Sequence, residues 1–198
     1  MSYLKRCKKN SLINPPSYVT TQLQYEVIMG SMAYGVSSDN SDIDIYGFSI
    51  PNKNVVFMDS HIRNFDPVTK VFEQYQEHHV IDKSARQEFD FTIYNIAKYF
   101  RLCANGNPNM IDSLFVPRNC ITHSTKIGEI VRENRHLFLS KKCWHTFKGY
   151  AYSMITKMNN KIKYKKIKEI QKFEDKNDIN RGTTFEEVIK EMKKRKLL

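Results

Sequence analysis

Apolar and polar residues alternate in two stretches of the chain, and this period of two predicts β-strands. Over residues 42–48, two carboxylates alternate with Ile43 and Ile45. Over residues 85–91, two phenylalanines share one face with Ala85 and Gln87, while charged residues take the other face. The Tyr-, Val- and Ile-rich run at 25–29 predicts another strand, and residues 55–58 predict a hairpin-like neighbour of the 42–48 strand.

Later stretches repeat their apolar residues at intervals of three and four, which predicts helices with one apolar face. This pattern covers residues 93–104, 109–115, 125 or 126 to about 139, 144–158 and 185–196. Gly106 ends the first of these helices, and Asn107 and Pro108 suit the cap and the first turn of the second. We expect the apolar stripe of 144–158, which starts at Trp144, to pack into the core.

Residues 59–84 show neither period. His78 and His79, with Glu77 beside them, are compatible with a metal site or with an exposed polar turn. Adjacent side chains do not easily chelate one ion, and no Cys or His stands at zinc spacing from them. The pattern therefore favours the turn.

Together these elements predict an α/β (α+β) fold, with helices packed on a small β-sheet and further helices at the C-terminal end. A chain of 198 residues supports one domain of ordinary size with an appendage. We expect a first domain over residues 1–155 and a lysine-rich helical extension over residues 156–198. Residues 1–17 are basic and then broken by Pro15 and Pro16. They are expected to form a solvated arm, with contacts to phosphate as the alternative.

The formal net charge of +11 indicates a polyanionic partner, with nucleic acid ahead of a membrane surface. Residues 156–198 contain 14 Lys and Arg against 7 Asp and Glu. Five of these lysines crowd one patch, which is either a solvated helix face or a surface for RNA or DNA phosphates. They are Lys161, Lys163, Lys165, Lys166 and Lys168.

The four cysteines are scattered and form no Cys-x-x-Cys pair, so they indicate reduced thiols rather than a zinc site or a disulfide framework. No apolar run is long enough to cross a bilayer, and no hydrophobic signal core follows the basic N-terminus. The sequence therefore predicts a cytoplasmic protein without a membrane partner.

The chemistry of the chain concentrates between residues 30 and 44. Gly30 lets the backbone approach a phosphate closely, and the Ser31 hydroxyl with nearby N–H groups can bind its oxygens. In a strand, Asp42 and Asp44 share one face, where a divalent cation such as Mg²⁺ would offset their repulsion. Asp90 in the later strand is open to two interpretations, either a third carboxylate that meets this pair across the sheet or the N-cap of the helix that follows.

These residues resemble a known signature. Gly30-Ser31, then ten residues, then Asp42-Ile43-Asp44 resembles the DNA polymerase beta-like nucleotidyltransferase superfamily. The surrounding sequence resembles the RNA-repair-associated branch of this superfamily in bacteria and phages. The segments that carry this resemblance are Gly-Ser-Met-Ala-Tyr-Gly, Ser-Asp-Ile-Asp-Ile-Tyr-Gly, the later Phe-Asp-Phe-Thr-Ile-Tyr, and Gly-Asn-Pro-Asn-Met-Ile-Asp-Ser-Leu-Phe. The resemblance spans roughly residues 24–158.

The resemblance implies a small mixed β-sheet with helices packed on it, and it implies an active site. Asp42, Asp44 and Asp90 would be catalytic and would hold Mg²⁺ or Mn²⁺, two ions per site, while Gly30, Ser31 and Ser41 would bind the nucleotide. The implied reaction moves a nucleoside monophosphate from an NTP to an acceptor hydroxyl, with an RNA 3′ end in RNA repair or modification as the expected acceptor.

Two alternatives stay open. The acceptor is a protein side chain or a small molecule, or the chain is a non-catalytic nucleic-acid-binding subunit. The family branch usually continues into a longer helical half, where this chain has a lysine-rich stretch. A separate protein partner that completes this half is therefore part of the expectation.

Overall fold

The computed structural model describes residues 2–38, 41–51 and 73–176, and near the end of the last helix it describes mainly the backbone. The chain divides into two compact units, Met1–Phe147 and Lys148–Leu198. The predicted strand at 55–58 and helix at 185–196 lie outside the described residues. In the described part, no helix is both long enough and apolar enough to cross a membrane.

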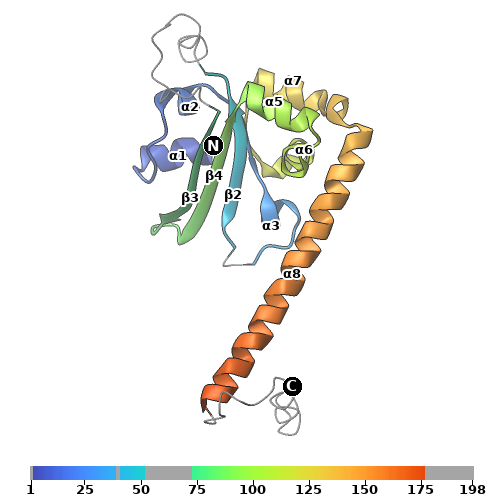
Figure 1. Ribbon diagram of the computed structural model, residues 1–198. Helices are drawn as coiled ribbons and strands as arrows, with labels where there is room; N and C mark the ends of the chain where they lie inside the picture. Colours follow the sequence, from blue (N-terminus) through green and yellow to red (C-terminus); the bar gives the residue numbers. More distant parts are fainter. Residues whose placement is uncertain (1, 39–40, 52–72, 177–198) are drawn as a thin grey trace, which may run out of the picture. The chain divides into compact units, whose positions relative to one another are not determined.

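A five-stranded mixed sheet organises the first unit (Figure 1). Its strands are β1 (Leu23–Ile28), β2 (Ile43–Ser49), β3 (Gln74–Asp82), β4 (Gln87–Asn95) and β5 (Ile121–Ser124), in the spatial order β3-β4-β2-β1-β5. Only β2 and β4 run parallel among these pairs, and the other neighbours are antiparallel. The predicted α+β class with a mixed sheet is confirmed.

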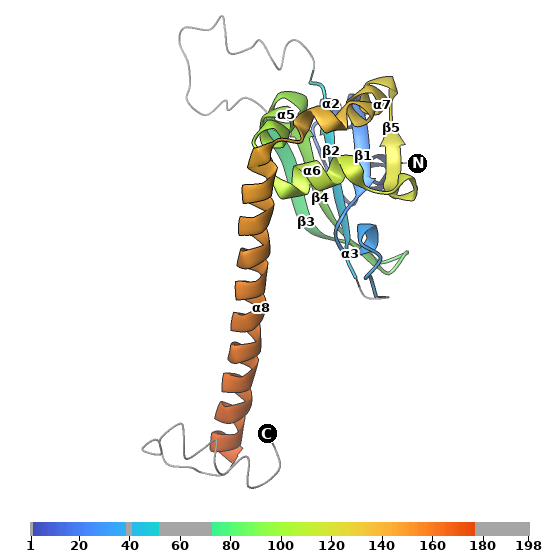
Figure 2. The ribbon, with the colours of Figure 1, turned by 90° about the vertical axis from the view of Figure 1, so that its right-hand side faces the viewer.

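Helices cover both faces of the sheet, as the two views show (Figures 1 and 2). On one face, α1 (Tyr3–Lys9) packs through the ring of Tyr3, whose centroid lies 5.4 Å from that of Phe89 in β4. On the other face, α5 (Ile96–Ala104) packs through Tyr99, whose ring centroid lies 4.9 Å from that of Phe48 in β2. Alternating residues of β2 and β4 therefore serve two separate layers.

Further helices complete the architecture, and the last of them, α8, extends past the apolar pattern that predicted it. They are α2 (Ser17–Thr21), α3 (Gly30–Ala33), α6 (Pro108–Phe115), η1 (Arg118–Cys120), α7 (Lys126–Glu133), η2 (Arg135–Phe138) and α8 (Lys141–Lys176). Asn107 caps α6 and Pro108 opens it, as predicted.

The N-terminal segment is not a solvated arm. Leu4 and Cys7 in α1 are fully buried, and Glu26 in β1 holds the start of the helix. The buried Glu26 carboxylate accepts hydrogen bonds from the Ser2 hydroxyl (2.8 Å) and from the backbone N–H groups of Tyr3 (2.7 Å) and Leu4 (3.0 Å). Because the first N–H groups of a helix lack partners within it, this carboxylate satisfies them and complements the helix dipole.

Three helix predictions need correction. Residues 93–95 belong to β4, because pairing with β2 continues to Asn95, and α5 begins at Ile96 with Asn95 as its cap. The helix predicted to reach about 139 ends at Glu133 and resumes as η2. At the start of α8, the side chain of Trp144 is 71% exposed whereas Phe147 packs against the core, so the predicted stripe is not a continuous core face. A helical period identifies a helix but not the surface that it packs against.

Candidate active site

The parallel pair β2 and β4 brings two of the predicted carboxylates side by side. Asp44 in β2 stands in register with Asp90 in β4. Their flanking neighbours, such as Ile43 and Phe89, point to the opposite face and are buried. A one-residue slip would exchange the two faces, so burial of these apolar residues fixes both carboxylates on the same side of the sheet.

The carboxylates also interact electrostatically. Partial burial raises the pKa of Asp44, and the negative charges of Asp42 and Asp90 raise it further, whereas His78 opposes the shift. Asp42 directly precedes β2 and is exposed. Two acidic groups thus raise the pKa of a third. A cation bound among the three would offset their mutual repulsion.

Gly30 lies against the same carboxylate. Gly30 is the first residue of α3 and has a φ of +63°. A Cβ added to Gly30 would clash with Oδ2 of Asp44. The backbone N–H of Met29 donates to the carbonyl oxygen of Asp44 at 2.8 Å. The turn and the β2 strand are therefore held together at this point, and glycine meets both the backbone conformation and the lack of space.

The two predicted nucleotide-binding serines differ in their surroundings. Ser31 is the second residue of α3, directly after Gly30, and is partly exposed. Ser41 lies in the turn before β2, where its hydroxyl accepts a hydrogen bond from the N–H of Ser38 at 2.9 Å. Gln87 at the start of β4 donates to the carbonyl oxygen of Ser41 at 3.1 Å. Binding of a nucleotide by either serine stays a prediction.

The strand β3 contributes two residues that the sequence assigned to a polar turn. Pairing of β3 with β4 shifts between Glu77 and Val80, and His79 in this bulge has a φ of +56°. The bulge turns His78 and His79 toward Asp90 across the strand pair. Nδ1 of His78 lies 3.1 Å from Oδ2 of Asp90, and the backbone N–H of His79 donates to Oδ1 at 2.8 Å.

These contacts change the interpretation of Asp90 and of the histidine pair. The N-cap alternative for Asp90 is excluded, because Asn95 caps α5. His79 also contacts Glu88 through its ring at 2.5 Å, which raises the pKa of His79. Ligand atoms of His79, Glu88 and Asp90 lie within 4.8 Å of one another, so the metal interpretation of this region involves Glu88 rather than Glu77. Period analysis missed β3 because the bulge interrupts its alternation.

The predicted lysine patch lies on α8, in the second unit. Lys161, Lys165 and Lys168 are exposed. The side chains of Lys163 and Lys166 lie outside the described part of the structure. Exposure suits both of the interpretations that the sequence left open, a solvated face and a phosphate-binding surface.

Comparison with known proteins identifies the family. The model of RlaP, the RNA repair pathway DNA polymerase beta family, matches residues 4–171. The chain belongs to RlaP. Membership in RlaP confirms the resemblance found in the sequence.

A curated relative comes from a phage. The chain is 22% identical over 130 residues to an uncharacterized 38.9 kDa protein of the nrdC-mobD intergenic region of Enterobacteria phage T4. The match covers 65% of this chain and 36% of the phage protein, so the chain spans about a third of that relative's length. No solved structure matches the chain.

Proposed function

We propose that this RlaP chain transfers a nucleoside monophosphate from an NTP to the 3′ hydroxyl of an RNA and releases pyrophosphate. The observation that carries the proposal is the register of Asp44 with Asp90 beside Gly30. The RNA acceptor is supported by the family's link to RNA repair and by the net charge of +11.

The residues present fit divalent cations. All donors in the core of the site are carboxylate oxygens, which Mg²⁺ and Mn²⁺ prefer. The pKa of Asp44 is raised first by burial and then by the negative charges of Asp42 and Asp90, and Gly30 brings only backbone, with no side chain, against its Oδ2. Asp42, Asp44 and Asp90 would hold the ions. Bound ions would supply neutralisation of the charge that develops on the phosphates.

The chain's own residues have distinct roles in the proposed reaction. The acceptor oxygen attacks the α-phosphorus, a new P–O bond forms, and the bond from the α-phosphorus to the α,β-bridging oxygen breaks. Pyrophosphate departs with that electron pair. The proton of the hydroxyl passes to the carboxylate of Asp90, which His78 and the N–H of His79 hold in position. Gly30 and Ser31 bind the departing phosphates.

The test compares the protein with a variant that carries Asp42→Asn and Asp44→Asn. Each is incubated with labelled NTPs, RNA and Mg²⁺, and RNA labelling is measured. We expect a loss of at least about a hundredfold in the variant, because the charge that stabilises the transition state depends on these groups. Exposed Glu133 in the same unit provides the control Glu133→Gln, which should retain full labelling.

Metal removal gives a second measurement in the same assay. Excess chelator should abolish labelling, and added Mg²⁺ or Mn²⁺ should restore it. Equal labelling by the doubly substituted variant and the unsubstituted protein would exclude the proposed mechanism.

A further inference from the structure

A cavity of about 170 Å³ opens next to the candidate active site. One wall comes from the turn and α3, through Met29, Ala33 and Tyr34. The opposite wall comes from α6, through Asp112 and Phe115, and from Val116 and Pro117 directly after it. Cavities that hold a whole drug-sized ligand measure about 300–1,000 Å³, so this one suits one part of a larger molecule.

The cavity is connected to the carboxylates through the backbone. Met29 lines the cavity, and its N–H donates to the carbonyl oxygen of Asp44 at 2.8 Å. The next residue, Gly30, lies against the Asp44 carboxylate. A nucleotide whose phosphates lie at Gly30 and Ser31 therefore has this cavity within reach of its other end.

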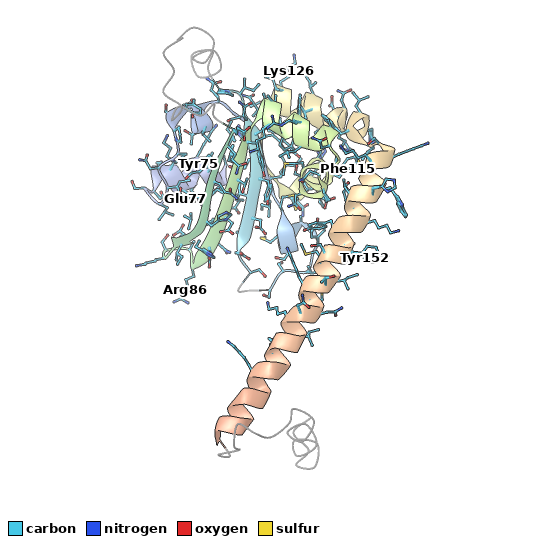
Figure 3. The ribbon with its side chains drawn as sticks, in the orientation of Figure 1. Tyr75, Glu77, Arg86, Phe115, Lys126 and Tyr152 are labelled. Atoms are coloured by element: carbon cyan, nitrogen blue, oxygen red, sulfur yellow. The ribbon has the colours of Figure 1, made fainter. Side chains whose placement is uncertain are left out.

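The apolar wall of the cavity contains an aromatic ring in a supported position. Phe115 is the last residue of α6 (Figure 3). The Arg135 guanidinium lies 5.0 Å from its ring centroid, and the His136 ring meets it edge-on at 5.5 Å. Phe115 is nevertheless 37% exposed and lines the cavity. A ring fixed on one side and open on another is a stacking platform for a flat heterocycle.

The charged group in the cavity wall is the carboxylate of Asp112. Its Oδ2 accepts a hydrogen bond from the Tyr34 hydroxyl at 2.6 Å, which joins α3 to α6 across the cavity. An ionised carboxylate only accepts hydrogen bonds, and its two oxygens have about four acceptor positions. Asp112 is therefore oriented by Tyr34 and keeps acceptor capacity for a ligand.

Among the four RNA bases, this acceptor pattern matches one. Guanine presents two adjacent donors, N1–H and the 2-amino group, which can pair with both oxygens of a carboxylate. Adenine and cytosine each place a ring acceptor beside their amino group, and uracil places its N3–H between two carbonyl oxygens. Ring acceptors and carbonyls face a carboxylate unfavourably, because neither partner donates a proton.

We propose that this cavity binds the guanine base of GTP, with Phe115 stacking on the base and Asp112 accepting from its N1–H and 2-amino groups. The proposal rests on the proposed function, which directs the triphosphate to Gly30 and Ser31. It adds a substrate preference, since the cavity wall selects the nucleotide by its base.

Binding of the four NTPs without RNA tests the proposal. Calorimetry with Ca²⁺ in place of Mg²⁺ measures affinity while turnover is suppressed. We expect the protein to bind GTP at least about tenfold more tightly than ATP, CTP or UTP. Asp112→Asn should lower GTP affinity by about 10-fold to 100-fold, the usual discrimination of one bidentate pair. The same variant should gain affinity for XTP, because the 2-carbonyl of xanthine accepts from the asparagine amide.

Two further variants separate base reading from general damage. Phe115→Leu should weaken all four NTPs by similar factors, because stacking tolerates any base. Tyr34→Phe keeps the ring and removes the hydrogen bond that orients Asp112, so it should reduce the preference for GTP less than Asp112→Asn does. Equal affinity of the unsubstituted protein for all four NTPs would overturn the proposal, as would an equal loss for all four in Asp112→Asn.

The assays distinguish failure of this proposal from failure of the proposed function. GTP binding that depends on Asp112, without transfer to RNA, supports the cavity assignment and contradicts the function. Transfer to RNA with no preference among NTPs supports the function and overturns the cavity assignment. A preference that follows only the 3′-terminal base of the RNA, measured with four RNAs that differ at that position, would assign the cavity to the acceptor and so overturn its assignment to GTP.

Discussion

At the scale of single residues, the acids proposed for catalysis lower the stability of the folded protein. Asp44 is half-buried beside two other acids, and its pKa is raised first by burial and then by Asp42 and Asp90. A carboxylate in such a position binds a proton more tightly in the folded chain than in the unfolded chain. The stability of the metal-free protein therefore falls as pH rises through the folded pKa of Asp44.

Asp44→Asn should stabilise the metal-free protein at neutral pH, because the neutral amide avoids this cost. Solvent screening of a half-buried group limits the gain to about 1 kcal/mol, or about 2–4 °C in Tm for a chain of this size. The gain should shrink as pH falls through the folded pKa and should vanish below the ordinary value of 3.8, where Asp44 is protonated in both states. Thermal unfolding followed by circular dichroism from pH 3.5 to 7.5 measures it. A gain that does not change with pH would contradict this account.

Two glycines offer a matched pair for testing the turn. Gly30 and Gly35 have similar φ values, +63° and +68°, but a Cβ would meet Asp44 at Gly30 and nothing within 4 Å at Gly35. Both Gly30→Ala and Gly35→Ala should lose about 1–2 kcal/mol of unfolding free energy, because alanine disfavours the left-handed region.

Gly30→Ala alone should also displace the Asp44 carboxylate. Since a shift of about 1 Å at a reacting group can cost about a hundredfold in rate, we expect RNA labelling to fall to that degree in Gly30→Ala and to persist in Gly35→Ala. Urea denaturation and the labelling assay provide the two readouts. Similar activity in both variants would show that the contact with Asp44 is not required.

At the scale of elements, a β-bulge and a buried carboxylate fix how neighbouring elements of the sheet unit meet. The bulge of β3 aims His78 and His79 at Asp90, and the carboxylate of Glu26 in β1 fastens α1 to the sheet. The first contact joins neighbouring strands of a hairpin. The second joins elements that are distant in sequence, and the hydrogen-bond donors around Glu26 compensate for its burial.

Glu26→Ala should destabilise the sheet unit strongly. It removes a buried acceptor from Ser2, Tyr3 and Leu4 at the start of α1, and bonds to a charged group contribute about 1.5–3 kcal/mol each. We expect a loss of at least about 3 kcal/mol in urea unfolding. The exposed Glu133 supplies the control, since Glu133→Ala should change stability by less than about 0.5 kcal/mol. A small effect of Glu26→Ala would mean that α1 docks through its apolar residues alone.

At the scale of the whole molecule, the candidate active site and the lysine patch belong to different units. The carboxylates and Gly30 lie in the first unit, whereas the lysine patch belongs to the second. The net charge of +11 favours a polyanion. Long-range attraction of this kind contributes affinity without sequence recognition, and salt weakens it.

Replacement of Lys161, Lys165 and Lys168 by Gln should lower RNA affinity and flatten its salt dependence. For single strands, the slope of log K against log salt should decrease by about 2 for three lost phosphate contacts. Fluorescence anisotropy between 50 and 300 mM salt measures both quantities. The same charge change at Lys83, Lys126 and Lys141, which are also exposed, is the control. Equal effects of the two triple variants would show that the patch contributes to RNA affinity only through the net charge of the protein.

The sequence alone predicted the acidic strand of the candidate site and several of the elements around it. Alternation between Asp42 and Ile45 fixed a strand with acids on one face, because burial of the isoleucines leaves one register. The cap at Asn107 followed from local rules in the same way, whereas the mixed sheet was expected only from the family resemblance. Such features depend on neighbours in the chain, so a pattern can reveal them.

The tertiary structure decided what depends on distant partners. Only the parallel pairing of β2 with β4 showed that Asp90 faces Asp44 rather than capping a helix. Only the bulge in β3 brought His78 to Asp90, and only the packing of α3 near α6 made a cavity with Asp112 in its wall. A period reports which face of an element is apolar, but the partner of each face is chosen by contacts far apart in sequence.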